Sequence, residues 1–141
     1  MFTIAHLHPM LVHFPIALVA IGFLLELAFL FLKKEVCLTR AGFYLLIIGT
    51  LAAIVTWLSG ILFTAEMEGA AGQVRDTHEL FATITMALLI VASVFRIMAL
   101  RLNNSKKLKN IAFVVYGLAM LSVSVTGFYG GTLVYNYMMP L

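Results

Sequence analysis

Four histidines are the residues in this chain whose types and spacing are best suited to chemistry. His6, His8 and His13 stand close together near the start, and His78 comes in the second half of the chain. Imidazole nitrogens bind iron, copper and zinc, and a ring nitrogen left without a partner at a membrane is costly. A fold that brings these side chains to one level would create a site for a metal or a metal cofactor.

The composition indicates where such a site would be built. The chain has 141 residues, of which 63% are hydrophobic and only 11% charged, with a mean hydropathy of +1.08. A soluble domain carries about 25% charged residues, so this chain has too little polar surface for water. Each membrane span needs about 20 apolar residues, which leaves room for four spans and little else. We expect a single all-α domain, an integral membrane four-helix bundle, with spans at about 10–32, 41–63, 79–100 and 111–138.

The distribution of charge predicts the orientation. Of nine Lys and Arg residues, eight lie in or beside the first and third connections, and only Arg75 lies in the second, 64–77, which is acidic. Cytoplasmic connections carry the excess of positive charge. We therefore expect both termini on the outer side of the membrane. The net charge of +3 reflects this topology and does not indicate nucleic-acid binding.

The predicted topology places all four histidines at the outer boundary. Two neutral imidazoles from facing helices are a common way to hold a six-coordinate haem. His13 and His78 enter the bilayer in the same direction at similar depth, so we predict that they are axial ligands of haem b, with His8 and His6 in reserve. Glu79 would orient His78, and Arg75 is the only cation of the outer loop near the haem propionates. The predicted role is electron transfer, with redox proteins or quinone as partners.

Two alternatives stay open. The histidines could bind copper or zinc, with Met10, Met67, Met138 and Met139 as additional soft ligands for copper. Otherwise the chain is a noncatalytic subunit or scaffold whose histidines only form hydrogen bonds. The single Cys37 excludes a covalent c-type haem and a cysteine-ligated cluster. We see no motif of a hydrolase or a nucleotide enzyme, so an electron carrier or a binding protein is favoured over a catalyst.

Other features predict how the helices are shaped and paired. Pro15 either kinks the first helix or marks its true start. The last apolar run is longer than a bilayer requires, so its end near Gly127, Gly130 and Gly131 should be irregular, and this face could also join two copies of the chain. Glu26 within the first span is favoured to be either a neutral acid bonded to a neighbouring helix or the partner of Arg96 of the third span, over a role in proton movement or a quinone hydrogen bond. The separation from His13 to His78 nearly equals that from Gly60 to Gly127, which is a weak sign of a duplicated hairpin.

Three motifs together resemble a known family. They are His8-Pro9-Met10-Leu11-Val12-His13-Phe14-Pro15-Ile16-Ala17-Leu18, the region of Trp57 followed by His78, and Gly130-Gly131-Thr132-Leu133-Val134-Tyr135. The chain is similar over essentially its whole length to the prokaryotic membrane family catalogued as domain of unknown function 2231. This resemblance implies a four-helix protein of the prokaryotic cytoplasmic membrane and no settled activity. The closing motif departs from the family pattern, in which a histidine and a glycine often follow. This departure leaves His13 and His78 as the strongest pair.

Overall fold

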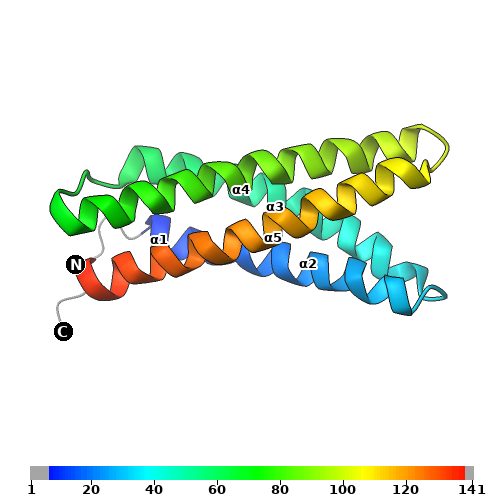
Figure 1. Cartoon of the computed structure of the whole chain (residues 1–141), viewed down its shortest axis with the longest axis horizontal. Helices are drawn as coiled ribbons and strands as arrows, with labels where there is room; N and C mark the ends of the chain where they lie inside the picture. Colours follow the sequence, from blue (N-terminus) through cyan, green and yellow to red (C-terminus); the bar gives the residue numbers. More distant parts are fainter. Residues whose placement is uncertain (1–6, 139–141) are drawn as a thin grey trace.

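A computed structural model describes residues 7–138, which fold into four long antiparallel helices (Figure 1). The first long helix has a break at Val12, and the last ends in a π-helical turn. The elements are α1 (Leu7–Leu11), α2 (His13–Phe31), α3 (Val36–Phe63), α4 (Gly69–Arg101), α5 (Lys106–Leu133) and η2 (Val134–Met138). All four helices are long and apolar enough to cross a membrane. The predicted all-α membrane architecture is therefore confirmed.

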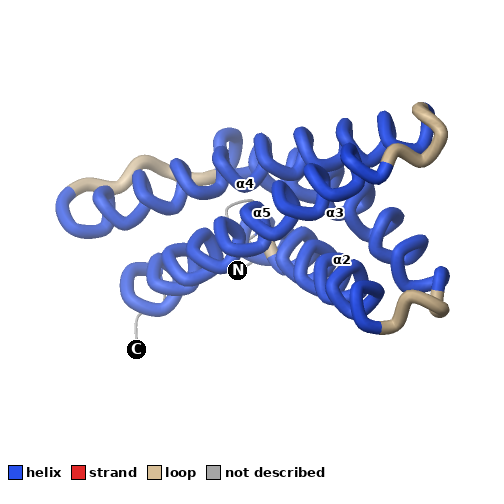
Figure 2. The backbone as a smooth tube through the Cα atoms, turned by 45° about the vertical axis from the view of Figure 1, so that its right-hand side comes forward, coloured by secondary structure: helices blue, strands red, loops and turns tan. Residues whose placement is uncertain are grey.

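The bundle consists of two helical hairpins that lie side by side. α2 packs along α3 and α4 along α5, while α3 contacts α4 and α2 contacts α5 (Figure 2). Short connections, 32–35 and 102–105, close the two hairpins. Such short connections force neighbouring helices to be antiparallel. Consequently α1 and the end of α5 lie at the same end of the bundle (Figure 1).

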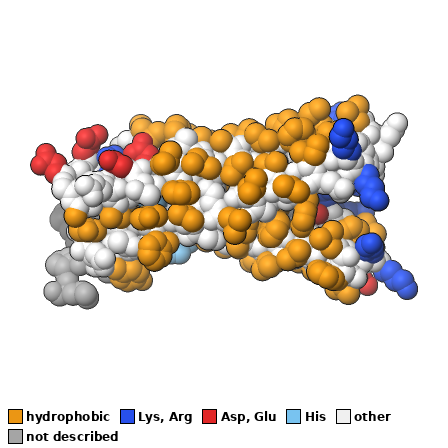
Figure 3. Space-filling view, viewed as in Figure 1, with side chains coloured by type: hydrophobic (Ala, Val, Ile, Leu, Met, Phe, Trp, Pro, Cys, Tyr) orange, Lys and Arg blue, Asp and Glu red, His pale blue; other side chains and the backbone are white. Residues whose placement is uncertain are grey.

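Small side chains fill most of the interior. Gly49, Ala92 and Ala119 are buried together with Val19 and Leu89, and such small residues let membrane helices approach closely. Tyr116 is 1% exposed, and its hydroxyl donates to the Val19 carbonyl at 3.1 Å. The outer faces of the helices carry large exposed hydrophobic side chains instead (Figure 3). A soluble protein buries most of its large apolar side chains, whereas this bundle exposes them, as suits a bundle surrounded by lipid.

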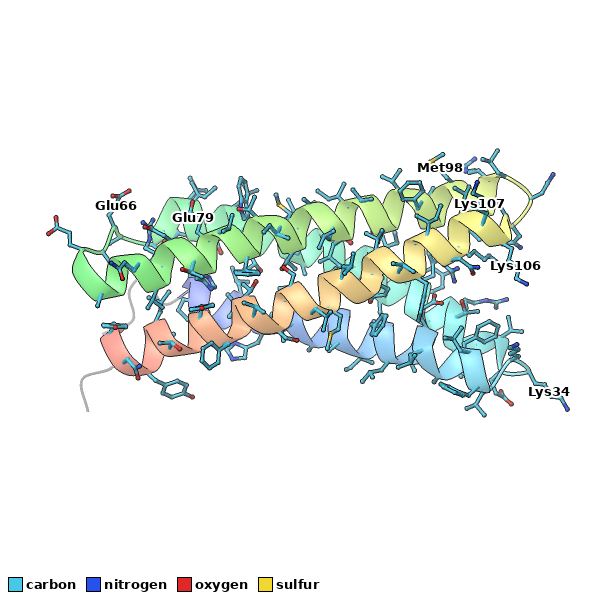
Figure 4. The ribbon with its side chains drawn as sticks, in the orientation of Figure 1. Lys34, Glu66, Glu79, Met98, Lys106 and Lys107 are labelled. Atoms are coloured by element: carbon cyan, nitrogen blue, oxygen red, sulfur yellow. The ribbon has the colours of Figure 1, made fainter. Side chains whose placement is uncertain are left out.

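Charge is segregated to the two ends of the bundle (Figures 3 and 4). We name the acidic end after Glu66, Glu68 and Asp76, which lie on the α3–α4 connection and the first turns of α4. The basic end carries Lys34, Lys106 and Lys107 on the two short connections and the helix ends beside them. The apolar length of the bundle lies between these ends, as expected for a membrane-spanning protein.

Three local features qualify the sequence predictions. The acidic connection was expected over 64–77, but α4 begins at Gly69, which has a φ of +64°, and its first turns project beyond the apolar zone. Pro15 lies near the start of α2, as one of the two predicted outcomes requires. Because Pro15 has no N–H to donate, the Leu11 carbonyl accepts from the Thr56 hydroxyl at 3.4 Å instead. α5 continues through its glycines, and the predicted irregular end follows at η2.

Candidate functional site

Two histidine rings face each other at the acidic end. His8 on α1 and His78 on α4 have ring centroids 6.2 Å apart, with the ring planes at 81°. Both rings are partly buried between the helices. α1 contacts α3, and this packing holds His8 at the level of His78 although the two residues come from opposite halves of the chain.

Hydrogen bonds fix the tautomer of each ring. His78 Nδ1 lies 3.0 Å from the Thr126 carbonyl, which can only accept, so this nitrogen carries the proton. His8 Nδ1 lies 2.8 Å from the Ser59 hydroxyl, which itself donates to the Thr56 carbonyl at 2.6 Å. Ser59 therefore accepts from His8. In each neutral ring, Nε2 is left with a free lone pair, the form in which imidazole binds a metal.

A glycine lies behind each imidazole. A Cβ at Gly60 of α3 would lie 3.0 Å from His8 Cε1, and a Cβ at Gly130 of α5 would lie 3.0 Å from His78 Cε1. These distances are shorter than ordinary van der Waals contact, so any larger residue would displace the ring. Gly60 therefore lets α3 pack closely against the ring of His8, and Gly130 lets α5 pack closely against the ring of His78.

The other predicted site residues occupy different positions. His13 is exposed, and its Nδ1 donates to the Pro9 carbonyl at 2.9 Å. The pairing of His13 with His78 stays a prediction. In the structure, the ring that lies against His78 is that of His8. Glu79 is 53% exposed and lies 4.0 Å from Arg75, while the group that orients His78 is the Thr126 carbonyl. His6 lies outside the described residues.

The two imidazoles have few potential co-ligands. Within residues 7–138, no three His, Cys, Asp or Glu side chains are grouped so that they could hold a metal ion. Zinc in proteins takes three or four protein ligands. The pair is therefore a two-ligand donor set, suited to a metal that brings its other ligands with it.

A second polar cluster lies toward the basic end, inside the bundle. Arg96 Nη2 of α4 lies 2.8 Å from Glu26 Oε1 of α2, and the two side chains are 10% and 12% exposed. The Thr39 hydroxyl of α3 donates to both Glu26 oxygens, at 3.2 and 3.1 Å. Of the two structural roles expected for Glu26, the structure has the pair with Arg96. A charged side chain buried in this way requires a partner of opposite charge, and Glu26 and Arg96 are partners of each other.

The sequence predicted all four histidines at one end of the bundle, and the three that lie within the described residues, His8, His13 and His78, are there. The residues that sequence reasoning missed are Ser59, Thr126 and Thr39, which supply the hydrogen bonds around the buried groups. The spacing carried a signal for the pairing of His8 with His78, although not for Ser59 or Thr39. His8 recurs as His78 and Gly60 as Gly130, both at the separation that also relates Glu26 to Arg96. His13, which lies in the same opening motif, has no such counterpart.

Comparison with known proteins identifies a family but no activity. A family model described as a predicted membrane protein, DUF2231, matches residues 5–140. Searches of curated proteins and of solved structures returned no match. The function must therefore be argued from the residues themselves.

Proposed function

Because the chain belongs to the DUF2231 family of predicted membrane proteins, whose name specifies no chemistry, we propose from its own side chains that it binds haem b between His8 and His78. The single observation that carries this proposal is the contact between the two imidazole rings, whose centroids lie 6.2 Å apart. A haem of this kind exchanges one electron at a time with its partners. The protein would thus be an electron carrier of the membrane.

The geometry of the two rings is compatible with one metal centre between them. Metal–imidazole bonds of about 2.0–2.1 Å from two opposite sides put the ring centroids roughly 6 Å apart. Both Nδ1 atoms are already engaged by Ser59 and Thr126, so neither competes for the metal. Such hydrogen bonds to a ligand imidazole fix its orientation and raise its basicity.

A haem fits this donor set better than a bare metal ion. The porphyrin supplies four nitrogen ligands, so two imidazoles complete the coordination of its iron. Zinc would require further ligands, and within residues 7–138 no third candidate is grouped with the pair.

The distribution of charge indicates the side of the membrane on which electrons would be exchanged. Lys34, Lys106 and Lys107 gather at the basic end, which the positive-inside rule assigns to the cytoplasm. The histidine pair lies at the acidic end and would face outward. We propose that its redox partners, whether proteins or quinone, approach from the outer side of the cytoplasmic membrane.

The test is a dithionite-reduced minus oxidised absorption spectrum of protein purified in detergent after expression with sufficient haem. We expect sharp α and Soret bands at about one haem per chain in the wild type, and their loss in His8→Ala and in His78→Ala. His13→Ala is the matched control, because this histidine lies close to His8 in the sequence but is exposed. Bands lost in His13→Ala but kept in His8→Ala would restore the His13–His78 pairing and contradict our assignment.

Metal analysis of the same samples separates the remaining candidates. Stoichiometric copper or zinc without porphyrin would replace the haem proposal with a metal-binding protein that uses the same imidazoles. A flat spectrum without any metal, in a protein that elutes as a single species, would overturn both. The chain would then be assigned as a noncatalytic membrane subunit, in which the histidines only make hydrogen bonds.

A further inference from the structure

The two hairpins begin and end at corresponding positions. α2 ends at Phe31 and α4 at Arg101, α3 begins at Val36 and α5 at Lys106, and α3 ends at Phe63 and α5 at Leu133. Each of these pairs has the same sequence separation as Glu26 and Arg96, which is 70. The caps agree as well, since Leu32 N–H donates to the Ala28 carbonyl and Leu102 N–H to the Met98 carbonyl, both at 2.9 Å. The two hairpins are therefore related by one constant separation of 70 residues. It takes the place of the two nearly equal separations, from His13 to His78 and from Gly60 to Gly127, that the sequence suggested.

Buried positions repeat with the same offset. Most of the buried residues in α2 and α3 have a buried residue at the equivalent position of α4 or α5. These pairs are Pro15 and Thr85, Val19 and Leu89, Gly22 and Ala92, Gly42 and Ala112, Leu46 and Tyr116, Gly49 and Ala119, and Ala53 and Val123. Both hairpins therefore bury the same face in the same register.

Two contacts between the hairpins join residues at equivalent positions. The ring of His8 lies against that of His78, and Glu26 forms its ion pair with Arg96. In a two-fold dimer, a residue on the axis contacts its own copy in the other subunit. Two such contacts, one near each end of the bundle, define an axis that runs along the helices.

The surroundings of the histidines repeat too. His78 donates to the Thr126 carbonyl, and His8 reaches the Thr56 carbonyl through the Ser59 hydroxyl. Thr56 and Thr126 again occupy equivalent positions, as do Gly60 and Gly130 behind the rings. Identical partners in equivalent places are not required by the packing of unrelated hairpins.

We infer that residues 8–63 and 78–133 are two copies of one helical hairpin, fused in tandem and packed about a two-fold axis along the membrane normal. The inner face of each hairpin is thus a docking surface for a copy of itself, and His8–His78 and Glu26–Arg96 are its contacts on the axis. This inference stands whether or not the chain binds haem.

The test exchanges the polar cluster between the copies. Glu26 and Thr39 of the first hairpin correspond to Arg96 and Lys109 of the second, and Lys109 lies beside the ion pair. Gly42 must be exchanged with them, because a Cβ at this position would lie 2.7 Å from Glu26 Cγ and its equivalent is Ala112. In Glu26→Arg/Thr39→Lys/Gly42→Ala/Arg96→Glu/Lys109→Thr/Ala112→Gly, every residue moves to its equivalent position. We expect this exchange to melt within a few degrees of the wild type in detergent, because the two-fold axis regenerates the same cluster on the other side.

Partial exchanges are the matched controls. Glu26→Arg and Arg96→Glu alone should lower the melting temperature strongly, because each places two like charges together. The double variant Glu26→Arg/Arg96→Glu should recover only part of the loss, because Thr39 and Lys109 then face the wrong charges. A sixfold exchange that is no more stable than this double variant would overturn the two-fold relation.

A circular permutant tests the same inference without altering the core. In the chain order 67–141 followed by 1–66, the new connection from Leu133 to His8 is one residue longer than the natural one from Phe63 to His78. If the hairpins are equivalent, both connections span the same distance. We expect a monodisperse protein that melts close to the wild type. A permutant that inserts into membranes but aggregates on extraction would contradict the inference.

Discussion

The two ends of the pseudo-two-fold axis carry different kinds of contact. At the acidic end the axis joins two identical residues, His8 and His78, whereas toward the basic end it joins the opposite residues Glu26 and Arg96. Neutral imidazoles can meet their own copies, but two glutamates or two arginines would repel each other in a low-dielectric interior. A buried ion pair on the axis therefore requires that the two hairpins differ in sequence at this position, whereas the histidine end has the same residue in both hairpins.

The largest effect should come from breaking the ion pair. Arg96→Met leaves Glu26 buried without its partner, which costs about 3–5 kcal/mol in comparable cases. We expect a large fall in the melting temperature of the detergent-solubilised protein. Glu26→Met/Arg96→Met removes both charges and should recover most of the loss, since apolar pairs often replace buried ion pairs without penalty. A double variant as unstable as Arg96→Met would mean that the pair, and not its charge balance, is essential.

An intermediate effect is expected from filling the space behind each imidazole. Gly60→Ala and Gly130→Ala both bring a methyl group within 3.0 Å of a histidine Cε1, and overpacking of this kind costs about 1–3 kcal/mol. Because the two glycines are equivalent, their variants should lower the melting temperature by similar amounts and perturb any haem bands similarly. Gly131→Ala is the matched control, since a Cβ there meets nothing within 4 Å. Strongly unequal effects at 60 and 130 would break the symmetry of the acidic end.

The sequence was sufficient for the architecture because hydropathy and charge are properties of whole segments. Four apolar runs predicted four helices, and Glu26 and Arg96 could be matched because buried charges of opposite sign in a membrane require each other. The choice between His8 and His13 depended on how the first span is rotated about its axis, because two residues five apart lie on different faces of a helix. Hydropathy does not report such a rotation. The hydrogen bonds of Ser59 and Thr126 depend on helix rotation and depth in the same way.

A smaller effect should follow from removing the acceptor of one ring only. His8 donates to the Ser59 hydroxyl, while His78 donates to a backbone carbonyl that no substitution deletes. Ser59→Ala should therefore cost about 0.5–1.5 kcal/mol and weaken the fixed orientation of His8 alone. The measurement is the melting temperature, with the ring resonances of His8 and His78 in labelled protein as the site-specific signal. Ser124→Ala on α5 is the control, because this exposed hydroxyl bonds only to the Met120 carbonyl within its own helix.

The smallest effect is expected at Glu79, next to His78 in the sequence. Its carboxylate is 53% exposed and lies 4.0 Å from Arg75, and exposed pairs of this kind contribute about 0–1 kcal/mol. Glu79→Ala should leave the melting temperature and the His78 ring resonances nearly unchanged, because the Thr126 carbonyl already accepts from His78 Nδ1. A loss as large as that of Ser59→Ala would show that the carboxylate orients the ring after all. His8 would then be oriented by a hydroxyl and His78 by a carboxylate. The two hairpins would in that case differ at the acidic end as they do at Glu26 and Arg96.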